Sequence, residues 1–177
     1  MIYKSDEIEK EALLTVAKLM AAAARTAPKA KGVDTILTLI VDGEDKARLS
    51  AEMRKIAEGG PGYSVFGRDA GNVDASEYVV LLANIDKHVG LPDCGVCGFE
   101  NCETSIAAGG PCIFNISDLG TASGSACAVA SRHWIDNRLM YTVGKAAMNI
   151  ELFGEKIRQC YGIPISAKGK SPYFDRK

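Results

Sequence analysis

The sequence carries almost no net charge: 21 lysines and arginines are set against 22 aspartates and glutamates, which leaves −1 at neutral pH. A chain without a basic excess has no field to draw it onto nucleic acid or an anionic membrane. We therefore expect neither partner. Histidine is scarce too, with 2 in 177 residues. His88 reads as a solvated loop histidine, and no carboxylate can be placed beside His133 from the sequence. We assign no catalytic residue.

Long apolar runs are also missing. The clearest uninterrupted run covers residues 78–83, whereas a membrane-spanning helix needs about 20 apolar residues. The first residues, MIYKSDEIEKE, are acidic and lack the basic start and apolar core of a secretory signal. These absences predict a cytoplasmic protein that does not cross a membrane. A chain of 177 residues is the size of one ordinary domain, and we expect residues 1–177 to form it.

Cysteine, by contrast, is well represented, with six residues in the chain. Because cytoplasmic thiols are kept reduced, the six indicate metal binding more than disulfides. Four of them fall within nineteen residues, in the stretch DCGVCGFENCETSIAAGGPC, with gaps of two, four and nine residues. Four thiolates gathered in this way are typical of an iron-sulfur cluster. The candidate ligands are Cys94, Cys97, Cys102 and Cys112.

The order of the gaps favours one type of cluster. Plant-type two-iron ferredoxins have a gap of four followed by a gap of two, and bacterial ferredoxins have proline after the fourth cysteine. Here the order is two and then four, and Pro111 precedes Cys112. The pattern predicts a single [4Fe-4S] cluster. A zinc site stays open as the alternative, although a zinc ribbon needs two C-x2-C knuckles and the sequence has one.

The pattern along the chain predicts helices alternating with two or three strands, which indicates an α/β or α+β arrangement. We expect Cys127 and Cys160 to be buried structural thiols, and residues 61–76 are polar and rich in glycine. The cysteine stretch, residues 91–112, follows the second strand as an insertion. We expect a first helix that Ser5 caps and that Ala27 and Pro28 end. Further helices are expected at 44–58 and 116–134, strands at 34–42 and 77–85, and helical patterns at 136–150 and 152–160.

Several segments resemble known families. The grouping C-G-x-C-G-x3-C resembles the four-iron domain of corrinoid and related iron-sulfur proteins. The segments AARTAPKAKGVD, FGRDAGNV, CGVCGFENC, ISDLGTASGSA, DNRLMYTVGKAA and GIPISAKGKSPYFDR together resemble an uncharacterised prokaryotic family whose members contain a ferredoxin domain. That second resemblance spans nearly the whole chain and implies a cluster without implying a substrate.

The first half of the chain is similar to flavin-dependent nitroreductases, because a helix ends at Ala27 and Pro28 and is followed by a strand and a helix. This resemblance implies an α+β fold with a nitroreductase-like mixed sheet flanked by helices, a homodimer and an FMN site. Basic residues from the two ends of the chain are then candidates for the flavin phosphate, approaching one another across the dimer. These are Arg25, Lys29, Lys168, Lys170 and Arg176. The alternative is that they are solvated charges.

Together these observations predict an iron-sulfur redox protein that transfers electrons through one [4Fe-4S] cluster, to either a bound flavin or a docked partner. Its partner would be a redox protein or a small-molecule acceptor, and the sequence names neither. The alternative is a non-enzymatic structural or sensing protein with a four-cysteine site for iron-sulfur or zinc.

Overall fold

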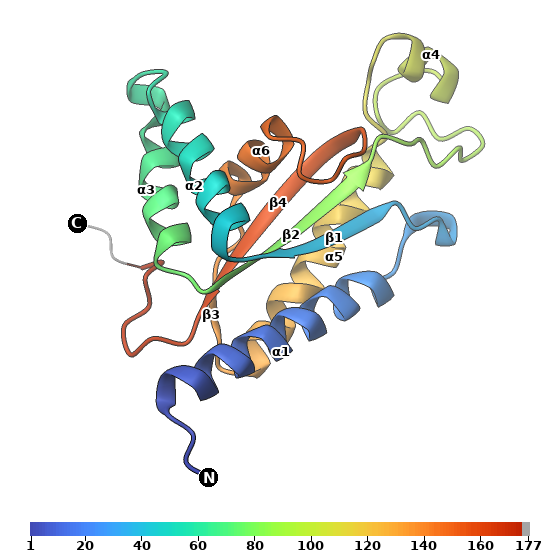
Figure 1. Cartoon of the computed structure of the whole chain (residues 1–177). Helices are drawn as coiled ribbons and strands as arrows, with labels where there is room; N and C mark the ends of the chain where they lie inside the picture. Colours follow the sequence, from blue (N-terminus) through green and yellow to red (C-terminus); the bar gives the residue numbers. More distant parts are fainter. Residues whose placement is uncertain (175–177) are drawn as a thin grey trace.

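A four-stranded sheet with helices on both faces forms the body of the protein (Figure 1). The computed structural model describes residues 1–174. The strand order is β1-β2-β4-β3, and each neighbouring pair is antiparallel. The strands are β1 (Ile36–Val41), β2 (Tyr78–Ile85), β3 (Asp136–Asn137) and β4 (Ile157–Ser166).

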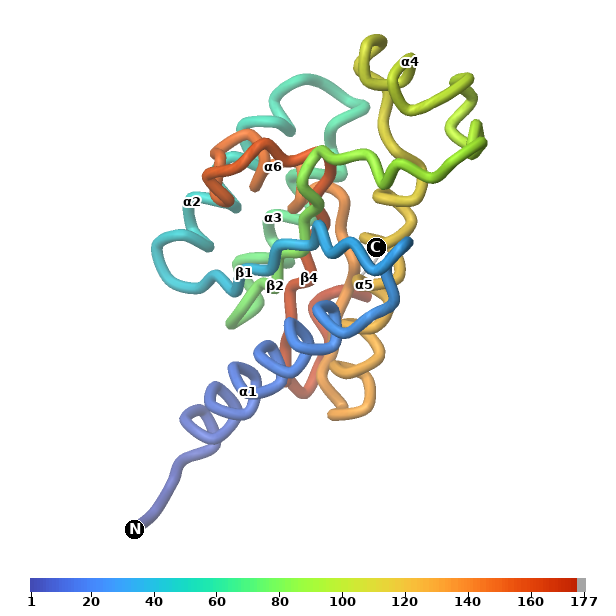
Figure 2. The backbone as a smooth tube through the Cα atoms, turned by 90° about the vertical axis from the view of Figure 1, so that its right-hand side faces the viewer, coloured from blue at the N-terminus to red at the C-terminus, as the bar shows by residue number. Residues whose placement is uncertain are grey.

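One helix layer consists of α1 (Ser5–Thr26) and α5 (Ile113–Arg132), which lie side by side in both ribbon views (Figures 1 and 2). Acidic residues in the first turn of α1 and Arg25 in its last turn suit the helix dipole. Pro28 follows the C-terminal cap, Ala27, and cannot continue the helix. The other layer consists of α2 (Gly43–Ala57), α3 (Ser64–Asp74) and α6 (Tyr141–Asn149).

Strand β2 joins the two halves of the core because its side chains alternate between the helix layers. Tyr78, Val80 and Leu82 pack with α1 and α5. The residues between them, including Val79 and Leu81, pack with the helices of the other layer. A strand covered on both faces contains apolar residues at successive positions, which explains the continuous run from Tyr78 to Ala83.

The expected α+β class is confirmed, and the pairings make the sheet antiparallel rather than mixed. The helix expected at residues 152–160 is wrong, because β4 begins at Ile157 and pairs with β2. The helical pattern at 136–150 is confirmed only from Tyr141 onward, since β3 occupies its start. Residues 61–76, for which no helix is expected, form a short 3-10 turn (Pro61–Tyr63) and α3.

Between β2 and α5 the chain leaves the sheet and forms a projecting lobe, residues 86–112, that contains α4 (Cys102–Ala107) (Figures 1 and 2). We refer to these residues as the cysteine lobe. Another 3-10 turn, Ala30–Gly32, follows α1. Within residues 1–174, no helix is both long enough and apolar enough to cross a membrane.

Candidate metal centre

All four candidate ligands lie on the cysteine lobe and carry free thiols. Cys97 lies in a turn, Cys94 lies on irregular backbone between two turns, and Cys102 is the first residue of α4. These three are partly exposed. Cys112 lies at the base of the lobe, directly before the first residue of α5, and is only 9% exposed. The lobe therefore has one anchored thiol and three thiols on more open backbone.

The backbone bends sharply around Cys94 and Cys97. Asp93 has φ 46°, Gly95 has φ 54° and Gly98 has φ 86°. The Gly98 amide donates a hydrogen bond of 3.0 Å to the Gly95 carbonyl, which closes a turn around Cys97. Glycine tolerates these left-handed conformations, whereas the same conformation in Asp93 is strained. The stretch is thus curved and irregular, as a loop that wraps a ligand must be.

The lobe has a small packed centre of its own. A Cβ added to Gly110 would lie 2.6 Å from Phe99 Cε2 and 2.8 Å from Ser105 Oγ, so Phe99 packs directly on the backbone there. Ser105 is fully buried, and its hydroxyl lies 3.0 Å from His88 Nε2. These contacts join the segment that carries the first three cysteines to the turn before Cys112.

Two buried asparagines hold the stem of the lobe against the sheet. Asn115 Nδ2 donates to the carbonyls of Ile85 (3.0 Å) and Lys87 (2.6 Å), where the chain leaves β2. Asn84 Nδ2 donates to the Asn115 side-chain oxygen, and Asn84 Oδ1 accepts a bond of 2.9 Å from the Gln159 amide of β4. The pair thereby fixes where Cys112, three residues before Asn115, stands relative to the sheet.

We expect Asn115→Ala to lower the free energy of unfolding by about 2 to 3 kcal/mol, because it leaves two backbone carbonyls and the Asn84 amide without this partner. Urea denaturation of the full chain measures the change. The control is Asn149→Ala, which removes an exposed bond to Glu52 and should cost no more than about 0.5 kcal/mol. Equal costs for the two variants would contradict a structural role for the buried pair.

The four cysteines share the lobe without forming a closed ligand set. Among residues 1–174, no three His, Cys, Asp or Glu side chains are grouped so that they could hold a metal ion. The donor chemistry nevertheless fits an iron-sulfur cluster, since four free thiols lie on one curved segment. The geometry therefore supplies the right donors on one lobe, with Cys94 and Cys97 on irregular backbone and Cys102 and Cys112 at the starts of α4 and α5.

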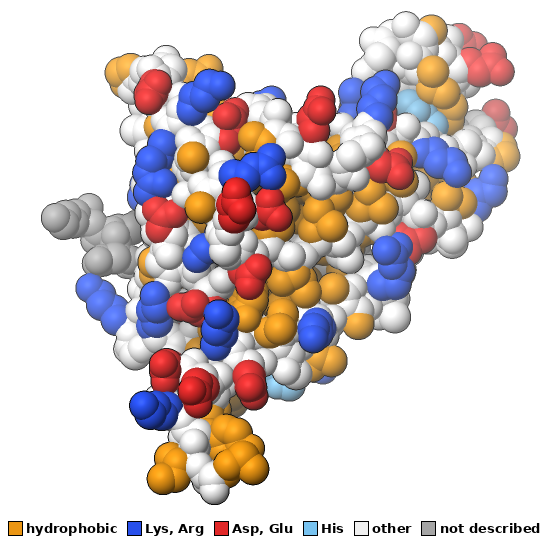
Figure 3. Space-filling view, in the orientation of Figure 1, with side chains coloured by type: hydrophobic (Ala, Val, Ile, Leu, Met, Phe, Trp, Pro, Cys, Tyr) orange, Lys and Arg blue, Asp and Glu red, His pale blue; other side chains and the backbone are white. Residues whose placement is uncertain are grey.

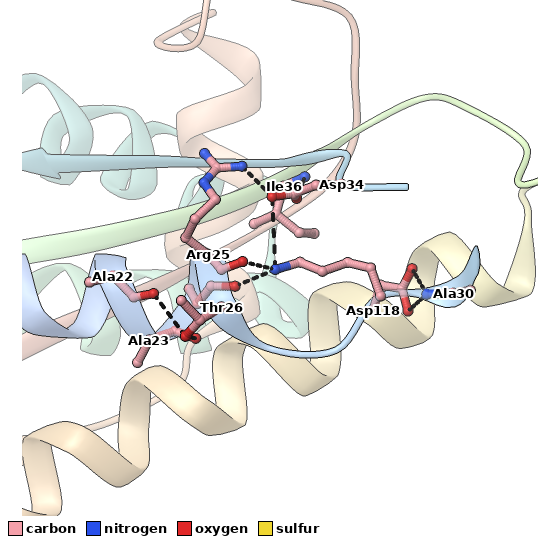
Figure 4. A network of polar contacts seen from close by, with 10 residues as sticks. Ala22, Ala23, Arg25, Thr26, Ala30, Asp34, Ile36 and Asp118 are labelled. Carbon is pink, nitrogen blue, oxygen red and sulfur yellow. Dashed lines mark hydrogen bonds and ion pairs between the residues drawn. The ribbon is translucent and has the colours of Figure 1, made fainter. Parts of the chain in front are cut away.

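The basic residues expected at a flavin phosphate are divided between two ends of α1. Arg25 pairs with Asp34 at 2.6 Å (Figure 4). The Lys29 ammonium donates to the carbonyls of Ala24 (2.7 Å) and Arg25 (2.5 Å), and its side chain is only 5% exposed. Burial lowers the pKa of Lys29, and Asp34 partly offsets this. Both cations thus already have partners within the chain: Arg25 pairs with the Asp34 carboxylate, and Lys29 donates to carbonyls of the last turn of α1.

Lys168 lies at the opposite end of α1, where it lines a surface hollow with residues from the first turns of that helix. Its ammonium donates to the Ala75 carbonyl at 2.5 Å. A helix of 22 residues is about 33 Å long, so one chain does not bring Lys168 to Arg25. Lys170 has interactions of its own, and Arg176 lies outside the described residues.

Asp118 of α5 is a buried acid that the sequence does not single out. Its two carboxylate oxygens accept from the Ala30 amide at 3.0 and 3.1 Å, which ties the turn after α1 to α5 (Figure 4). Burial raises the pKa of Asp118, and the bond from Ala30 opposes that rise. Its contacts are with the backbone of the turn, which indicates a structural role.

Cys160 is buried beneath α6 as expected, and burial raises its pKa to about 12. Alkylation requires the thiolate, and a raised pKa keeps the thiol protonated until the pH approaches that value or the chain unfolds. At pH 8 we expect iodoacetamide to modify Cys160 of the metal-free folded chain at least about tenfold more slowly than Cys94. Peptide mass spectrometry measures both rates. In urea the difference should vanish, and equal rates in the folded chain would contradict the burial.

A family model described as "Uncharacterized protein containing a ferredoxin domain (DUF2148)" matches residues 108–176. The match includes Cys112 and begins after the other three candidate ligands. A protein of Archaeoglobus fulgidus, named "Uncharacterized protein", is 40% identical over 185 residues. That alignment covers 99% of this chain and 98% of the archaeal protein.

Solved structures of nitroreductases share the fold. A nitroreductase with bound FMN from Desulfitobacterium hafniense has a TM-score of 0.59 at 14% identity, covering 99% of this chain and 85% of that one. A nitroreductase family protein from Clostridium novyi has a TM-score of 0.58 at 14% identity, covering 99% and 79%. NfrA1 from B. megaterium has a TM-score of 0.59 at 11% identity, but this chain spans only 61% of its length. The likeness confirms the expected nitroreductase-like fold, and at these identities it shows the fold alone.

Proposed function

Because the chain belongs to the family of proteins that contain a ferredoxin domain, we propose that it is an electron-transfer protein with one [4Fe-4S] cluster. Cys94, Cys97, Cys102 and Cys112 would hold the cluster. The observation that carries the proposal is the placement of four free thiols on one lobe. When bound, such a cluster supplies one-electron transfer at a potential set by its surroundings.

The four cysteines would have different roles in binding the cluster. Cys112 would act as the fixed ligand, because it is buried at the first turn of α5 and Asn115 holds that turn to the sheet. The amino end of a long helix also favours a thiolate. Cys94, Cys97 and Cys102 would move toward Cys112 as the turns of the lobe close.

Anaerobic reconstitution of the full chain with iron and sulfide tests the proposal. We expect a brown protein with broad visible absorption and about four irons per chain. Stoichiometric zinc in colourless protein, with no iron taken up on reconstitution, would instead favour a structural or sensing site.

FMN is the second cofactor that we propose, bound by a homodimer. Nitroreductases of this fold include one solved with bound FMN. Since Arg25 and Lys168 lie at opposite ends of α1 in one chain, a phosphate site that uses both needs a second copy. Sedimentation with added FMN should show the flavin moving with a species of twice the chain mass. A monomer that binds FMN, or a chain that binds none, would contradict this.

A further inference from the structure

A cavity of about 480 Å³ lies where the cysteine lobe joins the body of the protein. Its walls come from three segments that are distant in sequence: the chain after β2, the end of α4 with the turn that follows, and the start of β4. The lining includes Lys87, His88, Ile106, Gly109, Lys156 and Arg158. Ligand pockets for small molecules have volumes of about 300 to 1,000 Å³, so the cavity has the size of a binding site.

Positive charge dominates the lining of this cavity. Lys87, Lys156 and Arg158 line it together with one carboxylate, that of Asp86. Asp86 Oδ2 lies 3.5 Å from Lys156 Nζ, and Asp86 Oδ1 lies 3.7 Å from Arg158 Nε. One carboxylate cannot neutralise three cations, so the cavity keeps an excess of positive charge that an anion would offset.

The Arg158 guanidinium is held in place before any ligand arrives. Its Nη2 donates a bond of 2.5 Å to the Gly109 carbonyl, and its side chain is only 30% exposed. Gly109 lies three residues before Cys112, so this bond also fastens the lobe to β4. A positioned guanidinium binds carboxylate and phosphate oxygens well because its planar fork matches their geometry.

The rest of the lobe has the opposite charge. Residues 89–131 contain no lysine or arginine, while Asp93, Glu100 and Glu103 are exposed on the outer part of the lobe. Figure 3 shows basic side chains beside a histidine where the lobe meets the body, and acidic side chains farther out. An anion approaching the lobe would therefore be repelled from its tip and attracted to its base.

We propose that this cavity binds a small organic anion through a phosphate or carboxylate group. The anionic group would lie between Arg158 and Lys156, and Ile106 offers an apolar surface to the remainder of the molecule. The ligand would touch α4, which begins at Cys102, and the turn that precedes Cys112. Binding requires only these side chains, so the site is independent of whether the cysteines hold a cluster.

Nuclear magnetic resonance titration of the metal-free full chain at low salt tests the proposal, with inorganic phosphate and citrate as separate probes. We expect saturable amide shifts confined to residues 86–88, 106–110 and 156–158. The two probes distinguish a preference for phosphate from one for carboxylate. Raising the salt concentration should weaken binding, because the cations are partly exposed.

A double variant, Lys87→Gln with Lys156→Gln, should weaken binding of the preferred probe roughly tenfold. Lys156 is 87% exposed and Lys87 is exposed, so the fold should persist. The matched control, Lys10→Gln with Lys18→Gln, removes the same charge from exposed positions on α1 and should leave the affinity unchanged. Equal weakening in both variants, shifts outside the three segments, or no saturable shift with either probe would overturn the proposal.

Discussion

The Cys97→Ser chain is expected to lose its iron: after anaerobic reconstitution we expect the content to fall from about four irons per chain to less than one. Cys97 lies inside the turn closed by Gly98 and Gly95, at the centre of the curved stretch. A serine hydroxyl does not ionise as a thiol does, so it cannot replace the thiolate that the cluster requires. Iron and sulfide analysis together with the visible spectrum measures the loss.

The matched control for this variant is Cys127→Ser. Cys127 lies on α5 away from the lobe, and burial raises the pKa of its thiol, which disfavours the thiolate. We expect this chain to keep about four irons and the wild-type spectrum. Cys112→Ser should behave like Cys97→Ser. A Cys97→Ser chain with full iron, or a Cys127→Ser chain without it, would contradict the proposed ligand set.

The helices and strands that the sequence predicts are those whose signals are local. The apolar residues of α1 recur at helical spacing and Pro28 follows its end, so the sequence alone locates this helix. The buried run of β2 is equally clear. The four thiols of the candidate site are also a local signal, because they lie within one short stretch.

Helix α3 is harder to predict because its sequence contains Gly67 and Gly71, which are poor helix formers. Its stability comes from tertiary contacts. Phe66, Ala70 and Val73 are buried, and α3 packs extensively against α2. Packing of this kind outweighs propensity, and it depends on a partner that a local pattern does not reveal.

Strand β4 is even harder to predict from a local pattern. It contains Gly162 and Pro164, residues that are rare inside strands. Gly162 exchanges backbone hydrogen bonds with Met140 on the β3 side. Pro164 is two residues farther along, so its nitrogen points to that same side, away from β2. The proline therefore removes no bond from the β2 pairing, and the strand tolerates it.

The hydrogen bonds that hold the base of the cysteine lobe cannot be predicted from the sequence either. Asn84 and Asn115 are 31 residues apart, and Arg158 is 49 residues from Gly109. Nothing in the local sequence marks either pair, because each contact exists only once β2, α5 and β4 are assembled. Sequence spacing thus identifies the four thiols. The asparagines that fix the base of the lobe and the arginine that lines its cavity come together only in the folded chain.

Gly144→Ala should destabilise the protein by about 3 kcal/mol or more, even though alanine is the better helix former. Helix α6 packs on β4 at this position so closely that an added Cβ would overlap the carbonyl group of Cys160. The obstacle is backbone of a central strand rather than a flexible side chain, so relieving the overlap requires α6 to move away from β4. Urea denaturation of the full chain measures the change in the free energy of unfolding.

The control is Gly124→Ala on α5, where an added Cβ would have no neighbour within 4 Å. That substitution should stabilise the protein by about 0.5 to 1 kcal/mol, because only the helix propensity changes. The two variants make the same chemical change in helices, so opposite signs isolate the contact between α6 and β4. An insoluble Gly144→Ala chain beside a soluble Gly124→Ala chain would be the extreme form of this result. A Gly144→Ala chain as stable as the wild type would show that α6 does not rest on Cys160.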